Sequence, residues 1–126
     1  MSKSDGIWLP KPEAQDYKAA HDYLTLLFRE ADAARIVKRL RAAPIIQRQA
    51  KDLIRASQTH RLPESDLYVA NDLKKIRKGK KLSPVLLVRG DARHGVTLTI
   101  ADGYHRICAS WYWSEDEPVS CCLVNW

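Results

Sequence analysis

One junction in the sequence combines residue types that favour anion binding. A β-rich run is followed at once by a helical pattern, and the residues at the boundary are Asp102, Gly103, Tyr104, His105 and Arg106. The first backbone N–H groups of a helix have no partner inside it, and the helix dipole adds positive potential at that end. Glycine lets the backbone approach a ligand closely, and arginine forms bidentate pairs with phosphate. The junction therefore predicts binding of a phosphate-bearing ligand.

Each side chain near this junction has a chemical role and a structural alternative. Arg106 is the leading phosphate ligand, and its alternative is a structural pair with a carboxylate such as Asp102. His105 is a candidate phosphate donor or general acid, because imidazole titrates near pH 6.5, or else it caps the helix. Asp102 is a candidate base or magnesium ligand, or the N-cap of the helix. Tyr104 stacks on a base or ribose, or is simply exposed, and Ser83, at the mouth of an earlier strand, is a further candidate ligand.

Basic residues are concentrated in two segments. Residues 29–61 contain nine Lys or Arg against three acids, and residues 74–81 hold six basic residues in eight. Lys51 and Arg55 share one helix face at i,i+4 spacing, which suits either a salt-bridged surface or contact with a ligand. A basic surface for phosphate or nucleic acid would use these two together with Lys74, Lys75, Arg77 and Lys78.

Helical periodicity dominates the first half of the chain. Apolar residues recur at helical spacing over residues 17–28, then over 33–40, and again from Ile46 to about residue 60. Pro12 stands where proline suits the first turn of the first helix, and Pro44 interrupts the second pattern. We therefore expect three helices before residue 62.

The second half combines helix and strand patterns. Residues 66–78 are expected to form a helix, and two antiparallel strands should follow at residues 84–88 and 96–100. A helix from Gly103 to about Trp113 and a strand over residues 119–124 complete the order. The chain is therefore expected to be an α+β protein, in which helices precede an α-β-β-α-β core.

Length and composition fit one domain over residues 1–126. Hydrophobic residues make up 45% of the chain and charged residues 29%, and the net charge is +6. We divide the chain into an arm (1–11), a helical part (12–61) and a core (62–126). No apolar run is long enough to span a bilayer and no apolar signal core stands at the N-terminus, so we expect a cytoplasmic protein without membrane contact.

The sequence contains three cysteines, Cys108, Cys121 and Cys122, which we expect to be buried thiols rather than disulfides or metal ligands.

The junction also follows the spacing of a known box. Two variable positions separate Gly103 from Arg106, and the small residue Ala109 follows on the helix. Pro84 precedes the first core strand. With these residues, the segment 62–124 resembles the ParB/sulfiredoxin superfamily, and the whole chain is similar to small stand-alone bacterial ParB-like proteins. The resemblance implies N-terminal helices packed on a small ParB/sulfiredoxin-like core.

The resemblance also implies a nucleotide. Relatives hold a cytidine nucleotide or ATP at this box, so CTP, ATP or ADP with magnesium is implied against Gly103, His105 and Arg106. Tyr104 stands where sulfiredoxins have their catalytic cysteine, which argues against reduction of sulfinic acids. Three functions stay open: a nucleotide- or phosphate-binding domain associated with DNA through its basic helices, a nucleotide-dependent phosphotransferase or hydrolase, and a non-catalytic DNA or protein interaction module. The sequence assigns neither turnover nor an oligomeric state.

Overall fold

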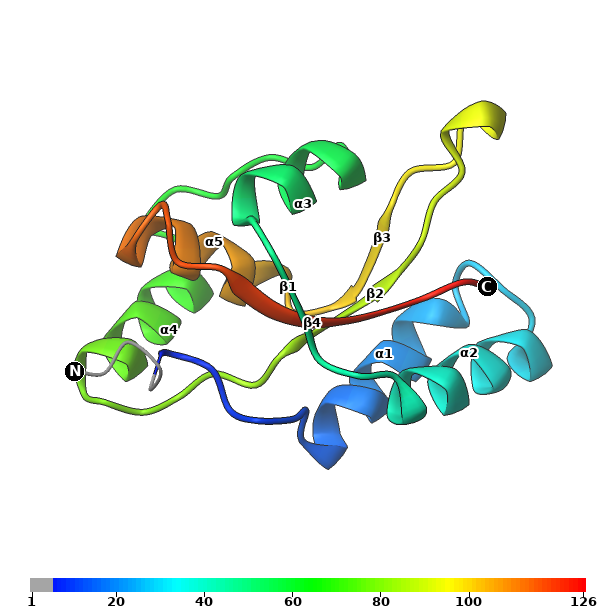
Figure 1. Cartoon of the computed structure of the whole chain (residues 1–126), viewed down its shortest axis with the longest axis horizontal. Coiled ribbons are helices and arrows are strands. Elements are labelled where there is room, and N and C mark those ends of the chain that lie inside the picture. The colour runs from blue at the N-terminus through cyan, green and yellow to red at the C-terminus, as the bar shows by residue number, and fades with distance from the viewer. Residues whose placement is uncertain (1–5) are drawn as a thin grey trace.

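The chain folds into helices around one mixed sheet. The computed structural model describes residues 6–126, so the first five residues of the expected arm lie outside the described part. In chain order the elements are α1 (Ala14–Leu24), α2 (Glu30–Ala42), β1 (Ile46–Arg48), α3 (Ala50–Ser57), α4 (Leu67–Arg77), β2 (Val85–Val88), η2 (Ala92–His94), β3 (Thr99–Asp102), α5 (Tyr104–Trp113) and β4 (Val119–Val124) (Figure 1). The expected α+β class is confirmed.

The four strands lie in the order β1-β4-β2-β3. The central strands β4 and β2 are parallel, whereas β1 runs antiparallel to β4 and β3 runs antiparallel to β2. Every residue of β2 is apolar and buried, which is typical of a strand covered on both faces. The antiparallel pairing expected for the first two core strands is confirmed.

Helices cover both faces of the sheet (Figure 1). Side chains alternate between the faces of a strand, so Val85 and Leu87 of β2 pack in one cluster with α3, α4 and α5. Leu86 and Val88 pack in a second cluster, with α1 and α2. The first two helices therefore cover one face, and α3 joins the layer of the two later helices on the other.

The third expected helix begins later than predicted. Residues 46–48 form the edge strand β1, in which Ile46 is paired with Cys121 of β4, and α3 starts only at Ala50. Pairing with a distant strand therefore overrides the helical spacing of Ile46. The prediction of a helix from Ile46 is wrong, because periodicity over one window carries no information about that partner.

The second core strand is shifted toward the junction. It covers Thr99–Asp102 rather than residues 96–100. Leu98 donates its backbone N–H to the carbonyl oxygen of Ala56 in α3 at 3.0 Å, and Val96 pairs with Asp91 in the loop. These contacts remove the first residues from the ladder, and Asp102 becomes part of the strand.

The described part of the arm docks on the body. The N–H of Leu82 donates to the carbonyl oxygen of Ile7 at 2.8 Å, and the N–H of Leu9 donates to that of Leu82 at 2.7 Å. Trp8 is buried, and its indole Nε1 donates to the carbonyl oxygen of Pro118 at 3.0 Å. Trp8 is therefore docked on the body, and residues 7–9 form a short parallel contact with the segment before β2.

Helix α1 differs from the prediction at both ends. Glu13 is its N-cap, and the Asp16 carboxylate accepts the Glu13 backbone N–H at 2.8 Å. Pro12 therefore lies before the helix and not in its first turn. The helix ends at Leu24, so Phe28 belongs to the connection that follows. This N-terminal capping arrangement holds Asp16 in a buried position.

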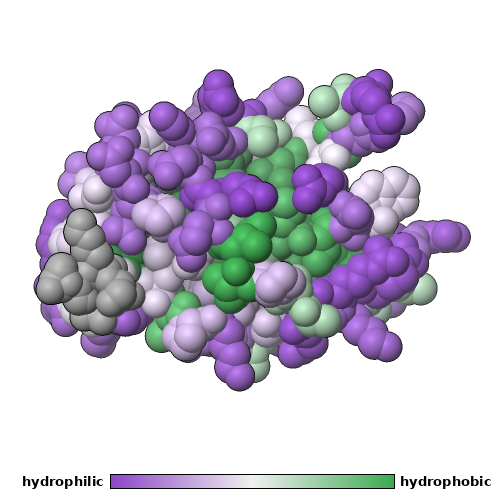
Figure 2. All heavy atoms as spheres, viewed as in Figure 1, coloured by the Kyte–Doolittle hydropathy of each residue, from purple (hydrophilic) through white to green (hydrophobic). Residues whose placement is uncertain are grey.

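The surface is mostly hydrophilic on the face that Figure 2 shows, with an apolar area in its middle. An apolar groove of about 390 Å³ lies between α3 and the β2–β3 connection, and its lining includes Leu53, Ala56, Val96, Leu98 and Leu123. Within residues 6–126, no helix has the length and apolar character needed to cross a membrane.

Packing of α2 on the sheet can be tested with a pair of leucines. Leu40 is fully buried in the second cluster, whereas Leu26 is 79% exposed. We expect Leu40→Ala to lower the free energy of unfolding by about 2–5 kcal/mol, since it leaves a cavity, and Leu26→Ala to change it by less than about 0.5 kcal/mol. Urea denaturation measures both, and equal effects would contradict this packing.

Candidate functional site

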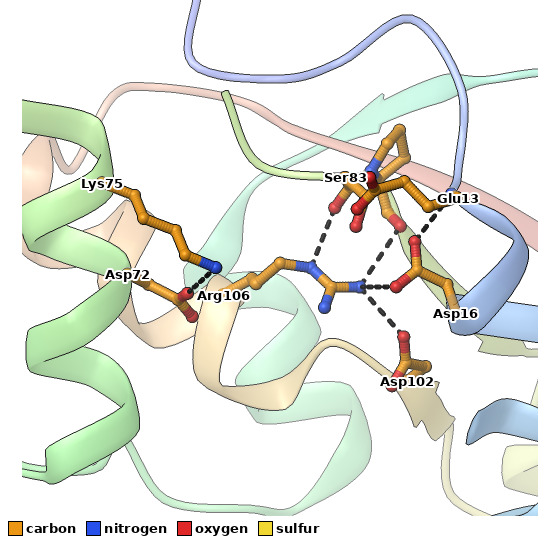
Figure 3. Close-up of polar contacts among 8 residues, drawn as sticks. Glu13, Asp16, Asp72, Lys75, Ser83, Asp102 and Arg106 are labelled. Atoms are coloured by element: carbon orange, nitrogen blue, oxygen red, sulfur yellow. Dashed lines mark hydrogen bonds and ion pairs between the residues drawn. The ribbon is translucent and has the colours of Figure 1, made fainter. Parts of the chain in front are cut away.

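Arg106 is held by other parts of the chain (Figure 3). Its Nε donates to the carbonyl oxygen of Ser83 at 2.9 Å, and its Nη2 lies 3.4 Å from the carbonyl oxygen of Pro84. The same Nη2 donates to Asp102 Oδ2 at 3.1 Å and lies 3.9 Å from Asp16 Oδ1. The Arg106 side chain is 17% exposed. Of the two roles considered for Arg106, the structure contains the carboxylate pair.

The two carboxylates come from distant parts of the sequence. Asp16 lies in the first turn of α1, and Asp102 ends β3. Burial raises the pKa of Asp102, the Arg106 guanidinium opposes that rise, and the neighbouring Asp16 adds to it. Asp102 is not the N-cap of α5, because Gly103 occupies that position and the Asp102 carboxylate binds Arg106. The ion cluster therefore joins α1, β3, α5 and the segment before β2.

Gly103 is required by packing inside the fold. Its φ of +110° lies in a region that favours glycine. A Cβ at this position would lie 2.4 Å from Val85 Cγ1 and 2.7 Å from Val85 Cβ. The close approach that Gly103 permits is thus an approach to β2, which brings the start of α5 against the centre of the sheet.

The first turn of α5 carries free backbone donors. No side chain caps this helix, and the N–H groups of Tyr104, His105 and Arg106 have no acceptor within residues 6–126. The first bond inside the helix runs from the N–H of Ile107 to the carbonyl oxygen of Gly103 at 3.0 Å. Unpaired N–H groups at the positive end of a helix favour an anion.

A cleft of about 480 Å³ lies between α4 and this helix start. Gly103, His105 and Arg106 line one side of the cleft. The opposite side carries the exposed cations of α4 and of the segment that follows it, Lys74, Lys75, Lys78 and Lys80. Two carboxylates, Asp72 and Asp102, also line the cleft, so fixed cations outnumber anions. We call this space the α4–α5 cleft.

Asp72 is a cleft residue that the sequence reasoning missed. Its side chain is 13% exposed, and its Oδ1 lies 3.9 Å from Lys75 Nζ (Figure 3). Burial raises the pKa of Asp72, whereas the charges of Lys75, Arg106 and His105 oppose that rise. Tyr68, Asp72 and Lys75 are spaced to share one face of α4, and this spacing was the available signal.

His105 lies between two tyrosine rings. Its ring centre is 5.0 Å from that of Tyr68 and 5.6 Å from that of Tyr104. The Tyr104 hydroxyl donates to the carbonyl oxygen of His60, which anchors the ring away from the α4–α5 cleft. Tyr68 is 60% exposed and lines the cleft. The tyrosine that lines this cleft is therefore Tyr68, whereas Tyr104 borders a second cleft on the other side of the junction.

A second cleft lies on the other side of the junction. Its volume is about 520 Å³, and it follows β3 along the open edge of the sheet. Asp102, Gly103 and His105 border both clefts. The rest of this second lining is less basic and includes Tyr23, Leu27, Ser57 and Thr59.

Several expected site residues lie outside both clefts. Ser83 is buried and contributes its backbone carbonyl to the guanidinium described above, rather than its side chain to a cleft. Lys51 and Arg55 are on α3, and neither lines a cleft at the junction. Arg55 and Arg77 each pair with a carboxylate, at 3.2 and 3.8 Å respectively. The expected basic surface is therefore divided, and only Lys74, Lys75 and Lys78 reach the α4–α5 cleft.

Asp102 does not fit the magnesium role. The Arg106 guanidinium lies 3.1 Å from its Oδ2, where it would repel a divalent cation. Within residues 6–126, no three His, Cys, Asp or Glu side chains are grouped to hold a metal ion. No chemical step is therefore assigned to magnesium at Asp102.

The cysteines are free and buried, as predicted. Burial raises the pKa of Cys121 to about 11 and also raises the pKa of Cys108 and of Cys122. All three are therefore protonated thiols near neutral pH, and the nucleophile of a thiol reaction is the thiolate.

The chain was compared with known proteins at three levels. Neither a protein-family model, nor a curated protein, nor a solved structure matches it.

Replacing Gly103 with alanine tests its packing role. The new Cβ would meet Val85, so we expect the free energy of unfolding to fall by about 2–5 kcal/mol. Gly95→Ala is the matched control, because Gly95 has a φ of +72° but no atom within 4 Å of an added Cβ. That control should lose about 1 kcal/mol from backbone strain alone. Equal losses in urea denaturation would show that contact with Val85 is unimportant.

The burial of Asp72 predicts a pH dependence. Its folded-state pKa is raised, so the native state binds more protons than the unfolded chain, and wild-type stability is lost as pH rises through that pKa. Asp72→Asn removes this loss. The free energy of unfolding of the variant minus that of the wild type should therefore increase between about pH 4 and about pH 7. Denaturation across this range measures the difference, with Asp52→Asn on α3 as control, and a constant or decreasing difference would contradict the burial.

Proposed function

We propose that residues 62–126 form a core of ParB/sulfiredoxin type whose α4–α5 cleft binds a nucleotide or another phosphate-bearing ligand. The element order α4-β2-β3-α5-β4 supports the first part of this proposal. The observation that carries the second part is the set of cleft lysines facing the uncapped start of α5.

The charge arrangement of the cleft favours a polyanion. Lys74, Lys78 and Lys80 form no ion pair with any carboxylate of residues 6–126, and all three are exposed. Like charges gathered in one cleft repel one another, and a bound phosphate group relieves that repulsion. The backbone N–H groups at the start of α5 add directed donors for the phosphate oxygens.

The three junction residues Gly103, His105 and Arg106 have different roles in the proposed site. Arg106 positions the start of α5 through its carbonyl and carboxylate contacts. His105 lines the cleft and donates a hydrogen bond to a phosphate oxygen through its ring. Gly103 brings the helix start close to β2. Direct charge contacts therefore come mainly from the lysines of α4, and not from Arg106.

Calorimetric titration with ATP, CTP and ADP in the presence of magnesium tests the cleft. We expect saturable binding by the wild type and at least a tenfold loss of affinity, about 1.4 kcal/mol, in Lys74→Glu/Lys78→Glu. The control Lys38→Glu/Lys51→Glu changes the net charge equally but alters exposed lysines on α2 and α3. Equal losses in the two double variants, or no binding by the wild type, would contradict the proposal.

The same samples separate binding from catalysis. Release of inorganic phosphate during incubation with ATP or CTP would indicate a phosphotransferase or hydrolase, and binding without release would indicate a binding domain. Association with DNA through these lysines should weaken steeply as salt is raised, and nucleotide should compete with it. DNA binding that survives Lys74→Glu/Lys78→Glu would assign the DNA contact to another surface.

A further inference from the structure

Asp72 is a largely buried carboxylate that receives no hydrogen bond from residues 6–126. Its side chain is 13% exposed, and its one ion pair, with Lys75 at 3.9 Å, is longer than a hydrogen bond. Asp102 is similarly buried, at 20% exposed, but accepts a hydrogen bond from Arg106 at 3.1 Å. The Asp72 oxygens keep some contact with solvent, since Ser110 Oγ is the one side-chain polar atom of residues 6–126 that is both fully buried and without a hydrogen-bond partner. Asp72 lines the α4–α5 cleft, so its free oxygens face the space in which a ligand would lie.

The charges around Asp72 indicate which kind of ligand group could donate a hydrogen bond to its carboxylate. Lys75, Arg106 and His105 are close enough to affect its pKa, and further lysines line the cleft. A cationic donor such as an ammonium group would be repelled by these charges. A hydroxyl group is a neutral donor, and a hydrogen bond to a carboxylate is stronger than one between neutral groups. The charge balance therefore favours a hydroxyl.

The spacing on α4 relates this acceptor to the phosphate site. Lys75 follows Asp72 by three residues, so the two side chains are neighbours on α4. The Lys75 Nζ lies 3.9 Å from Asp72 Oδ1, so a phosphate group bound at Lys75 would bring neighbouring hydroxyl groups of the same ligand close to Asp72.

We infer that Asp72 accepts a hydrogen bond from a hydroxyl group of the phosphate-bearing ligand, so that the cleft selects phosphate esters with a free hydroxyl. This inference rests on the proposed function, since it places the phosphate of that ligand against the lysines of the α4–α5 cleft. It narrows the ligand class to hydroxylated esters, such as sugar phosphates and ribonucleotides, over inorganic phosphates and deoxygenated analogues.

Calorimetry with matched probes tests the inference. The pairs are glycerol 3-phosphate with propyl phosphate, and ATP with 2′,3′-dideoxyATP, while inorganic pyrophosphate reports on the phosphate site alone. The wild type should bind the hydroxylated member of at least one pair about tenfold more tightly, the effect of a hydrogen bond to a charged group.

Asp72→Asn should change two measurements in opposite directions. The preference for the hydroxylated probe should fall to about threefold or less, because the amide oxygen is a weaker acceptor than a carboxylate. Affinity for pyrophosphate should rise, because the variant removes an anion from the cleft. A misfolded variant would lose both the preference for the hydroxylated probe and the affinity for pyrophosphate. A higher affinity for pyrophosphate therefore also shows that the cleft is intact. Asp52→Asn, which removes a carboxylate from α3 outside the cleft, should change neither measurement.

The outcomes separate this inference from the proposed function. If the wild type binds pyrophosphate but does not distinguish either pair, the hydroxyl role of Asp72 is wrong and the phosphate site stands. The same conclusion follows if Asp72→Asn binds pyrophosphate at least as tightly as the wild type and keeps the full preference for the hydroxylated probe. Weaker pyrophosphate binding by the variant would indicate a disrupted cleft, and the preference of the wild type alone would then decide the inference. If the wild type binds none of the five probes, the phosphate site and the role of Asp72 both fail.

Discussion

One largely buried guanidinium connects the segments that border the site. Arg106 of α5 binds the chain before β2 through the Ser83 carbonyl, the end of β3 through Asp102, and α1 through Asp16. Removing a cation from water costs free energy unless it is paired and hydrogen-bonded, and these acceptors offset that cost. Gly103 allows α5 to begin against β2, so that Arg106 reaches all three segments. The position of the first turn of α5 depends on this cluster.

The internal contacts of Arg106 determine which charged and polar groups of the cleft remain free to bind a ligand. Its Nε and Nη2 are used inside the fold, so the cleft cations that form no ion pair within residues 6–126 are Lys74, Lys78 and Lys80. They face uncapped N–H groups on α5, while Asp72 supplies a carboxylate that accepts no hydrogen bond from residues 6–126. An anion with a neutral donor group complements all three features. The ion cluster and the α4–α5 cleft thus meet at the start of α5, where the cluster uses the Arg106 side chain and the cleft uses the backbone N–H groups of the first turn.

Local signals predicted much of the fold and many of the residues that line the α4–α5 cleft, but not the contacts that give those residues their roles. The last strand agrees with its prediction at every residue, and α4 lies within one residue of its predicted bounds at each end, because the periodicity of apolar residues is a local property. Strand β1 was missed because its partner β4 lies more than 70 residues away, a separation no window covers. The Arg106–Asp16 pair spans still more of the chain. The burial of Asp72 depends on how α4 packs against α5, so its sequence neighbourhood showed only a charged helix face.

Anion binding between α4 and the first turn of α5 can be measured by titrating isotope-labelled protein with inorganic pyrophosphate and following the backbone amide chemical shifts. We expect saturable shifts at the N–H groups of Tyr104 and His105 and along residues 74–80, with the amides of α2 unchanged. Shifts confined to α2 and α3, or none at any concentration, would show that the anion does not bind there.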